Sequence, residues 1–371
     1  MTQVNRIILS GGGTGGHIYP ALSICKRLKE LNPQLECLYI GTQRGLESTL
    51  VPGHGLDFAS IQIQGIKRSL SLDNLKSLYL MLTSTSKAKK LIQEFKPEVV
   101  VGTGGYVCAP VVYAAAKLGI PTLIHEQNSV AGLTNKFLAA KVCRIATCFE
   151  AVHKDFSKHQ DKIRLTGNPR AQEVAEIVKD PRLITRQFDL DSSLPTVLIF
   201  GGSRGAPAIN KAALEAIPLW QEVDYQVIIA TGKDHYQEIS SSLNLEDLPQ
   251  NIKILPYIDN MPQVFKAIDI VVCRSGATTL TELMALGKPS VLIPSPYVTN
   301  NHQEYNAKAL VDKGAALMIK QSDLNGKELF DQLNDLLFNQ DKLEDMSKQA
   351  RKMAVIDATD QIINELNHLI H

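Results

Sequence analysis

A pattern of an apolar strand, a glycine-rich loop and an amphipathic helix occurs twice in this chain. The first copy is "RIILSGGGTGGHIYPALSICKRL", which starts at Arg6, and the second is "TVLIFGGSRGAPAINKAALEAI", which starts at Thr196. Further continuous apolar runs, among them "EVVVGTGG", "YQVIIATG" and "DIVVCRSG", are separated by helical stretches. Such runs are typical of strands buried on both faces in parallel sheets. The sequence therefore predicts the α/β class, with two Rossmann-like, doubly wound domains.

The length of 371 residues also favours two domains, at roughly 150 residues per domain. A predicted strand ends in "RLTGNPR", residues 164–170, where Gly167, Asn168 and Pro169 break regular structure. We therefore expect one domain at residues 1–165 and a second at 166–354. The last helical stretch, about residues 355–371, could pack on either half, and we expect it to pack back on the first.

The composition excludes several classes of protein. The net charge of +1 gives no reason to expect a nucleic-acid partner. Six cysteines without a CxxC pair predict reduced thiols in a cytosolic protein. The N-terminus does not have the form of a signal peptide. The one acidic DxD motif, Asp189 and Asp191, precedes a predicted strand, so we interpret it as a surface turn, and we expect neither a metal nor a cofactor.

Ligands of parallel sheets bind beyond the carboxyl ends of the strands. Most of the unusual residues follow such strand ends, at positions 11–17, 102–106, 125–128, 201–205 and 275–282. Two sheets of this kind predict a site in a cleft between the domains.

The first glycine loop fits GxGxxG through Gly11, Gly13 and Gly16. Alone, this motif fits a dinucleotide site, a phosphate site or a tight turn. The second predicted strand ends in "YIGTQRG", without the acidic residue that an NAD site would have there. Arg44 leaves an NADP site open, but the second glycine loop is hard to explain with one dinucleotide.

The second half adds polar groups at helix starts, where free N–H groups favour phosphate. Ser203 and Arg204 suit a diphosphate, although Ser203 could equally be a helix N-cap. Glu282 is expected within the first turn of a helix, where it could accept both hydroxyls of a ribose or merely complement the helix N-terminus. His125 could be a satisfied, half-buried histidine. Arg170 is the best candidate for a guanidinium that binds the negatively charged phosphate groups.

Seven motifs in order along the chain carry a family resemblance. They are "GGGTGGHIYPAL", "GTGGYV", "HEQNSVAGLTNK", "TGNPR", "GGSRGA", "CRSGATTLTEL" and "NHQEYNA", and they span residues 5 to 310. Together they resemble the MurG family of peptidoglycan N-acetylglucosaminyltransferases, which have the GT-B fold. The resemblance implies transfer of N-acetylglucosamine from its UDP form to the C4 hydroxyl of N-acetylmuramyl-pentapeptide on undecaprenyl diphosphate. It also implies inversion at the anomeric centre and a catalytic site without metal.

The resemblance implies roles for particular residues. His17 would remove the proton from the attacking hydroxyl, since an imidazole titrates near neutral pH. Glu126 is a rival base, and His17 could equally orient the acceptor diphosphate. The implied substrate-binding residues are Thr14, Gly15, Gly16, Asn128, Arg170, Ser203, Ile258, Ala277, Thr278, Thr279, Leu280, Thr281, Glu282 and Gln303.

Among these, Thr14, Gly15 and Gly16 would lie near the donor sugar and the acceptor diphosphate, and Asn128 would bind the donor. Arg170 and Ser203 would hold the donor diphosphate. Ile258 would meet uracil through its backbone, Glu282 would hold the ribose, and Gln303 would hold the sugar hydroxyls. Cys108 and Ala109 depart from the serine and glycine that the family pattern suggests, and "GNPR" lacks an extra residue that some members carry.

A lipid acceptor implies contact with a membrane. The segment "SLDNLKSLYLMLTSTSKAKKLIQEF" is predicted as a helix whose stripe of Leu72, Leu75, Tyr79 and Leu82 faces the core. Leu80 and Met81 lie outside that stripe, and flanking cations suit an anionic leaflet: Lys67, Arg68, Lys87, Lys89 and Lys90. We expect peripheral binding at the cytoplasmic face of the inner membrane, although an ordinary buried helix would also fit.

Three other functions fit parts of the sequence. A glycosyltransferase acting on another lipid, such as a diacylglycerol, is disfavoured by "HEQN" together with "GGTGGH". An NADP-dependent oxidoreductase would leave Glu282, Gln303 and the second loop without a role. A non-catalytic UDP-sugar-binding protein would bind the donor without turnover.

Overall fold

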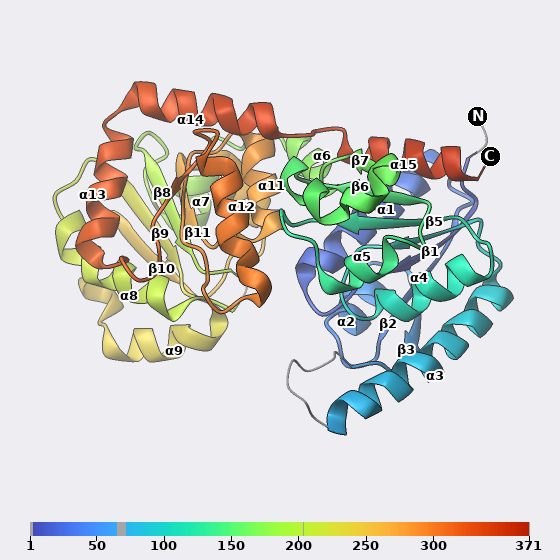
Figure 1. The fold of residues 1–371 in the computed structure, drawn as a ribbon. Helices are drawn as coiled ribbons and strands as arrows, with labels where there is room; N and C mark the ends of the chain where they lie inside the picture. The colour runs from blue at the N-terminus through green and yellow to red at the C-terminus, as the bar shows by residue number, and fades with distance from the viewer. Residues whose placement is uncertain (1–2, 65–71, 203, 371) are drawn as a thin grey trace. The chain divides into compact units, whose positions relative to one another are not determined.

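The structure is a computed structural model that describes residues 3–64, 72–202 and 204–370, without the side chains of residues 72–78. The chain forms two compact units (Figure 1). The first consists of Met1–Gln172 with Val355–His371, and the second is Glu173–Ala354. Both are α/β units built on a parallel sheet, as the apolar runs predict.

The first unit has a seven-stranded sheet in the order β3-β2-β1-β4-β5-β6-β7. Every neighbouring pair is parallel, and Ile7 lies opposite both Cys37 and Val99. The strands are β1 (Arg6–Ser10), β2 (Glu36–Thr42), β3 (Asp57–Ile61), β4 (Val99–Gly102), β5 (Thr122–Glu126), β6 (Arg144–Thr147) and β7 (Ile163–Leu165).

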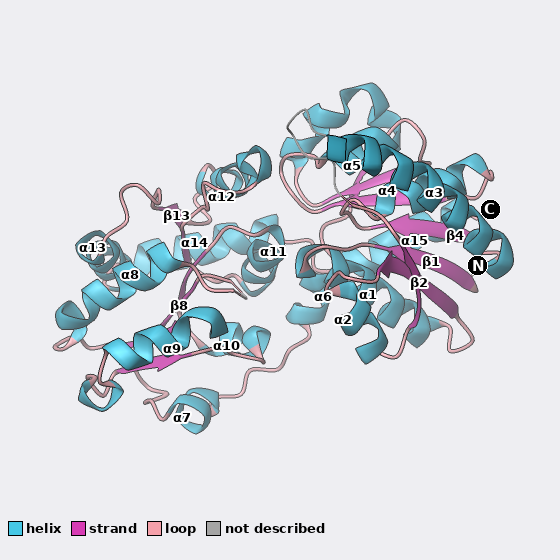
Figure 2. Cartoon of the chain, turned by 90° about the horizontal axis from the view of Figure 1, so that it is seen from below, coloured by secondary structure: helices cyan, strands magenta, loops and turns pink. Residues whose placement is uncertain are grey.

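Helices cover both faces of this sheet (Figure 2). Ile7 and Leu9 face the core that includes residues of α1, α2 and α15, whereas Ile8 faces α3, α4 and α5. This alternation along β1 is the reason that a strand buried on both faces is apolar at every position. The helices are α1 (Gly15–Leu31), α2 (Glu47–Gly53), α3 (Leu72–Phe95), α4 (Cys108–Lys117), α5 (Leu133–Leu138), the 3₁₀ segment η1 (Glu150–Lys162), α6 (Arg170–Ala175) and α15 (Ala358–Leu369).

The second unit has a six-stranded parallel sheet in the order β10-β9-β8-β11-β12-β13. Its strands are β8 (Thr196–Phe200), β9 (Gln226–Ala230), β10 (Ile252–Leu255), β11 (Ile270–Cys273), β12 (Ser290–Leu292) and β13 (Leu317–Met318). Its helices are α7 (Leu183–Phe188), α8 (Pro207–Ala216), η2 (Ile217–Trp220), α9 (Lys233–Ser242), η3 (Leu245–Asp247), α10 (Met261–Ala267), α11 (Ala277–Leu286), η4 (Thr299–Asn301), α12 (His302–Val311), α13 (Gly326–Leu337) and α14 (Gln340–Met353). Val197 and Ile199 of β8 pack against buried side chains of α8 and α13.

The C-terminal helix α15 belongs to the first unit and packs on α1. Ile362 and Leu366 are buried in the same core as Ile18 of α1. At the edge of this contact, Arg27 Nε lies 2.8 Å from an Asp360 carboxylate oxygen. Apolar burial therefore attaches the helix, because half-exposed ion pairs contribute at most about 1 kcal/mol each.

The orientation of α3 differs from the sequence prediction. Tyr79 and Leu82 were expected to face the core, but they are 65% and 66% exposed. Among the described side chains of this helix, the buried positions are Ser84, Ala88 and Ile92, which are four residues apart and therefore share a face. Leu80 and Met81 are half-buried, so they are not the most exposed apolar pair. The predicted residues Lys67 and Arg68, and the side chains of Leu72 and Leu75, lie outside the described residues.

No helix in the described part of the chain is long and apolar enough to span a membrane. The largely apolar run at residues 99–124 forms β4, α4 and the start of β5. None of the six cysteines, all of which the structure describes, forms a disulfide bond.

Candidate active site

Each sheet has a point where the strand order reverses direction, and such points are where open α/β sheets bind ligands. In the first unit this point lies between β1 and β4, and in the second it lies between β8 and β11. The first glycine loop follows β1, and the second follows β8. Both predicted loops therefore stand at the switch point of their own sheet.

The loops after β1 and β4 are joined closely. Gly12 N donates a hydrogen bond to Gly104 O at 3.2 Å. Gly105 has a φ of +83°, and a Cβ there would lie 2.4 Å from Gly12 O. Both the backbone conformation and the contact require glycine. The "GTGGYV" motif thus acts as a support for the first glycine loop.

His17 lies in the first turn of α1, between these two loops. Its Nδ1 lies 2.9 Å from Gly12 O, and a Cβ on Gly104 would be 2.6 Å from its Cδ2. Because a carbonyl oxygen can only accept, Nδ1 carries the hydrogen. In the neutral imidazole, Nε2 is then the nitrogen that can accept a proton. The loop therefore fixes the ring in the tautomer that a general base requires.

Glu47 is a buried carboxylate that the sequence analysis missed. One oxygen accepts hydrogen bonds from Thr42 N at 3.0 Å and Thr42 Oγ1 at 2.6 Å, and the other accepts from Gly13 N at 3.1 Å. The side chain is fully buried. An NAD site would have its acidic residue at the end of the second strand, whereas Glu47 follows five residues after that strand, in "GTQRGLE".

The position of Glu47 bears on the dinucleotide alternative. Its carboxylate already uses the Gly13 N–H, and a Cβ on Gly12 would be 2.5 Å from its Oε1. The Gly13 N–H is therefore not available to bind a diphosphate. This arrangement disfavours a dinucleotide on the first loop.

Glu126, the rival base, ends β5 and is 2% exposed. One of its oxygens accepts from Asn128 N at 3.0 Å and Asn128 Nδ2 at 3.2 Å. The other accepts from Gly132 N at 2.9 Å and Asn135 Nδ2 at 2.8 Å. Four donors therefore hold both oxygens, and the carboxylate shapes the loop that carries Asn128.

His125 is fully buried, not half-buried as one sequence interpretation had it. Its Nε2 donates to Gly167 O at 2.9 Å, and its Nδ1 accepts from Gln127 Nε2 at 2.8 Å. Burial lowers the pKa of this imidazole to about 4. His125 is thus a neutral link between β5 and the segment after β7.

Arg170 belongs to the first unit, where it is the first residue of α6. Its guanidinium lies 5.4 Å from the ring centroid of Tyr19, which is two residues beyond His17 on α1. Such stacking holds a guanidinium in place. Thr14 precedes α1, and Gly15 and Gly16 begin it, so these three are near His17 in the chain.

Cys108 and Ala109, the departures from the family pattern, start α4, the helix that follows the loop after β4. The buried Cys108 thiol donates to Ser10 O at 2.8 Å and lies 2.9 Å from Gly104 O. Burial raises its pKa to about 12, so it stays a thiol. Cys108 therefore provides the same kind of hydrogen bond as a serine would.

In the second unit, the loop after β8 is as tightly built as the first. Gly205 has a φ of +77°, and a Cβ there would lie 2.1 Å from Thr231 O, in the loop after β9. Arg204 is exposed. Ser203, which was predicted to hold a diphosphate, lies outside the described residues.

The N-terminus of α11 contains most of the predicted donor residues. Gly276 is its N-cap, and Ala277, Thr278, Thr279, Leu280 and Thr281 follow. The first turn contains no acidic residue. The Thr278 hydroxyl oxygen is buried and has no hydrogen-bond partner in the described part of the protein. Buried hydroxyls are nearly always paired, so this one is a candidate to bind a ligand.

Glu282 lies in the second turn of α11 and not in the first, as the sequence had suggested. It is 8% exposed. Since dipole effects act mainly in the first turn of a helix, Glu282 is not explained as a complement to the helix N-terminus. The correction favours the ligand-binding interpretation of this carboxylate.

Gln303, in the first turn of α12, contacts the segments near the N-terminus of α11. Its Oε1 accepts from Ser295 N at 2.9 Å, and its backbone oxygen accepts from Ser275 Oγ at 2.8 Å. Ile258, in the segment after β10, is 2% exposed, so its side chain packs inside the second unit. These contacts place Gln303 beside the strand end that leads into α11.

The DxD residues lie before β8, at the opposite end of this strand from the second glycine loop. The Asp189 side chain is 98% exposed, and Asp191 holds the local turn through Ser193. Throughout the described ranges, no group of three or more His, Cys, Asp or Glu side chains could hold a metal ion.

Models of known protein families match both halves of the chain. Residues 7–147 match the glycosyltransferase family 28 N-terminal domain, and residues 196–362 match the family 28 C-terminal domain. The chain is 50% identical over 365 residues to a UDP-N-acetylglucosamine–N-acetylmuramyl-(pentapeptide) pyrophosphoryl-undecaprenol N-acetylglucosamine transferase of Bacillus cereus, covering 98% of this chain and 99% of that protein. It is 51% identical to the transferase of the same name from Lactiplantibacillus plantarum, with the same coverage.

A solved structure gives the same result. The crystal structure of Acinetobacter baumannii MurG matches with a TM-score of 0.77 and 29% identity, over 98% of this chain and 99% of that one. The two parallel sheets and the matched halves define a glycosyltransferase of the GT-B class. The chain belongs to glycosyltransferase family 28 and, within it, to the MurG family.

Proposed function

We propose that this protein transfers N-acetylglucosamine from UDP-N-acetylglucosamine to the C4 hydroxyl of undecaprenyl-diphosphate-linked N-acetylmuramyl-pentapeptide. The identity of 50% over nearly the whole chain to transferases of that name supports this reaction. The observation that carries the mechanism is the contact between His17 Nδ1 and Gly12 O, which leaves Nε2 as the basic nitrogen.

His17 is the general base of the proposed reaction. Its Nε2 takes the proton of the C4 hydroxyl while that oxygen forms a bond to the anomeric carbon of the donor sugar. The bond from the anomeric carbon to the diphosphate breaks, and UDP leaves with the electron pair, so the configuration inverts. Glu126 acts as a positioning residue that holds Asn128, because four donors already occupy its oxygens.

The donor is held by the switch point of the second sheet. Thr278 offers a hydroxyl that has no partner among the described residues, and Glu282 offers a carboxylate for the ribose hydroxyls. The free N–H groups at the start of α11 and the loop after β8 suit the diphosphate. Arg170, stacked on Tyr19, offsets the charge that develops on the leaving UDP.

Peripheral attachment to the cytoplasmic face of the membrane completes the proposal. The exposed side chains Tyr79 and Leu82 of α3 lie on the same unit as Leu133 and Phe137 of α5, which are 67% and 51% exposed. The helix also carries the exposed cations Lys87, Lys89 and Lys90. Exposed apolar groups beside lysines favour binding to an anionic leaflet.

Transfer of labelled N-acetylglucosamine to a short-chain muramyl-pentapeptide lipid, in the presence of EDTA, tests the reaction. Formation of the disaccharide lipid at a rate that EDTA does not change is the expected result. Binding of the UDP-sugar without any transfer would contradict the proposal and favour another acceptor or a binding protein.

A further inference from the structure

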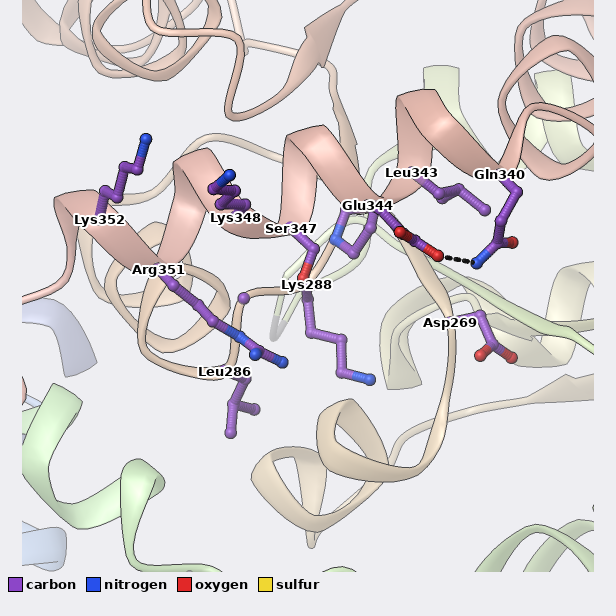
Figure 3. Close-up of a pocket in the computed structure, with 12 residues that line it drawn as sticks. Asp269, Leu286, Lys288, Gln340, Leu343, Glu344, Ser347, Lys348, Arg351 and Lys352 are labelled. Carbon is purple, nitrogen blue, oxygen red and sulfur yellow. Dashed lines mark hydrogen bonds between the residues drawn. The ribbon is translucent and has the colours of Figure 1, made fainter.

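A cavity of about 670 Å³ lies in the second unit, under α14 (Figure 3). Asp269 directly precedes β11, and Lys288 lies two residues before β12, so the cavity is at the amino ends of these strands. The glycine loop after β8 and the start of α11 are at the carboxyl ends. Because the sheet is parallel, the cavity and the proposed donor site lie at opposite edges of it.

The cavity has an excess of positive charge. Four cations line it, Lys288, Lys348, Arg351 and Lys352, against two carboxylates. The carboxylate of Asp269 accepts a hydrogen bond from Thr196 N at 2.8 Å, and that of Glu344 accepts one from Gln340 Nε2 at 2.9 Å. None of the ion pairs found within the described part of the chain includes any of these four cations.

Lys288 is the most enclosed of the four. Its Nζ donates to Ile268 O. Its pKa is lowered to about 8, mainly by burial; Asp269 acts in the opposite direction, and the neighbouring cations Lys179, Arg351 and Lys266 add to the lowering. A buried ammonium among cations is unfavourable unless an anion offsets it.

The C-terminus of α11 does not by itself explain why cations gather at this cavity. A helix C-terminus favours nearby cations, but backbone N–H groups already satisfy two of its last four carbonyls. Gly287 N donates to Met284 O at 3.0 Å, and Lys288 N donates to Leu283 O at 2.8 Å. Arg351 points from α14 toward Leu286 and Lys288 (Figure 3). Its guanidinium therefore faces the cavity together with the lysine.

We propose that this cavity binds a small phosphate-bearing anion, such as a diphosphate or a phosphate ester, at a site separate from the donor site. The guanidinium of Arg351 and the ammonium of Lys288, which both face the cavity (Figure 3), match a multivalent oxyanion. The volume falls within the range of about 300–1,000 Å³ that is usual for small-molecule sites. The inference does not rest on the proposed transferase activity.

Titration calorimetry with inorganic pyrophosphate tests the site, with UDP present at saturation to occupy the donor site and without divalent cations. Two variants remove one cation each, Arg351→Gln and Lys288→Met. The matched control is Lys313→Gln, which removes an exposed cation that does not line the cavity. We expect at least a fivefold loss of affinity in each pocket variant and none in the control. Melting temperatures check that the variants fold.

A second readout follows from Lys288. An anion that binds beside this ammonium raises its pKa, so the protein takes up protons on binding at pH 8, and the measured enthalpy depends on the buffer. Lys288→Met removes this dependence. Equal affinity in wild type and both pocket variants, or no binding of millimolar pyrophosphate to the wild type, would overturn the proposal.

The phosphate could belong to a soluble molecule or to a lipid headgroup. Binding to phosphatidylglycerol vesicles separates the two sources. If Arg351→Gln binds pyrophosphate more weakly than the wild type but binds vesicles equally well, the site is assigned to a soluble anion. A parallel loss of vesicle binding in Arg351→Gln assigns it to a lipid headgroup.

Discussion

His17 Nδ1 and Gly12 O lie 2.9 Å apart, and this one contact sets the chemistry of the imidazole. The carbonyl keeps the hydrogen on Nδ1 and presents Nε2 as the acceptor. The position of Gly12 depends in turn on its neighbour Gly13, whose N–H is held by Glu47. The tautomer of His17 therefore rests on a buried carboxylate that does not contact the imidazole.

Glu47→Ala should lower both stability and activity. The change leaves the backbone N–H groups of Gly13 and Thr42 without their acceptor and opens a cavity beside the loop. We expect a loss of about 3 kcal/mol in the free energy of unfolding, and a lower kcat in the surviving folded protein. Urea denaturation and the transfer assay measure the two effects. The matched control Glu176→Gln, at an exposed site, should leave both unchanged. A fully active and stable Glu47→Ala would refute the role of this carboxylate.

His125 should make the first unit sensitive to acid. Its folded pKa of about 4 is below the unfolded value of about 6.5, so the folded state binds fewer protons. The stability that it contributes is complete above pH 6.5 and is lost as the pH falls toward 4. Between pH 7.5 and 5.0, the loss amounts to about 2 kcal/mol. The decrease in unfolding free energy over this range should be smaller by that amount in His125→Gln. Equal decreases in the two proteins would contradict the prediction.

The exposed pair on α3 should control vesicle binding. Tyr79→Glu with Leu82→Glu replaces two exposed apolar groups by charges that an anionic surface repels. We expect at least a tenfold weaker binding to phosphatidylglycerol vesicles in a sedimentation assay, with an unchanged melting temperature. A control pair in the second unit, Val178→Glu with Leu219→Glu, should bind as the wild type does.

The half-buried neighbours should behave differently. Leu80→Glu with Met81→Glu places charges partly inside the protein, so we expect a lower melting temperature in addition to any effect on vesicles. Vesicle binding that depends on Leu80 and Met81, but not on Tyr79 and Leu82, would show that the membrane contact lies elsewhere on the helix.

Thr278→Val should separate ligand binding from folding. The hydroxyl has no partner within the described protein, so its removal leaves no protein group unpaired. We expect a melting temperature within about 2 °C of wild type and up to a tenfold weaker binding of UDP-N-acetylglucosamine. Thr85→Val is the comparison, since that hydroxyl donates to the backbone oxygen of Met81 on α3, outside the predicted donor residues, and its loss should leave donor binding unchanged. Unchanged donor affinity in Thr278→Val would remove this residue from the site.

The sequence predicted the fold class and both glycine loops because buried parallel strands and strand-to-helix turns depend on local patterns. Apolar runs such as that of β1 do not occur by chance on a half-exposed strand. The side of α3 that packs against the core could not be predicted from a local pattern. Its apolar residues do not share one face, and burial of Ala88 and Ile92 is decided by packing on other elements.

The missed features of the site have a common cause. Glu47 reaches the loop after β1 from α2, and Arg170 stacks on Tyr19 across more than one hundred residues of chain. Contacts of this kind leave no periodic pattern in the sequence. Glu282 was placed one turn too early because the start of α11 was not fixed by a capping side chain.

The central claim is that His17 is the general base of glycosyl transfer. The most direct test is the rate of transfer to the short-chain lipid by His17→Asn, measured with binding of UDP-N-acetylglucosamine as the check on folding. The account predicts a fall in kcat of about 10²–10⁴-fold, as expected for loss of a general base, with donor affinity within threefold of wild type. A variant that keeps its kcat within threefold would contradict the account and would return the role of base to Glu126.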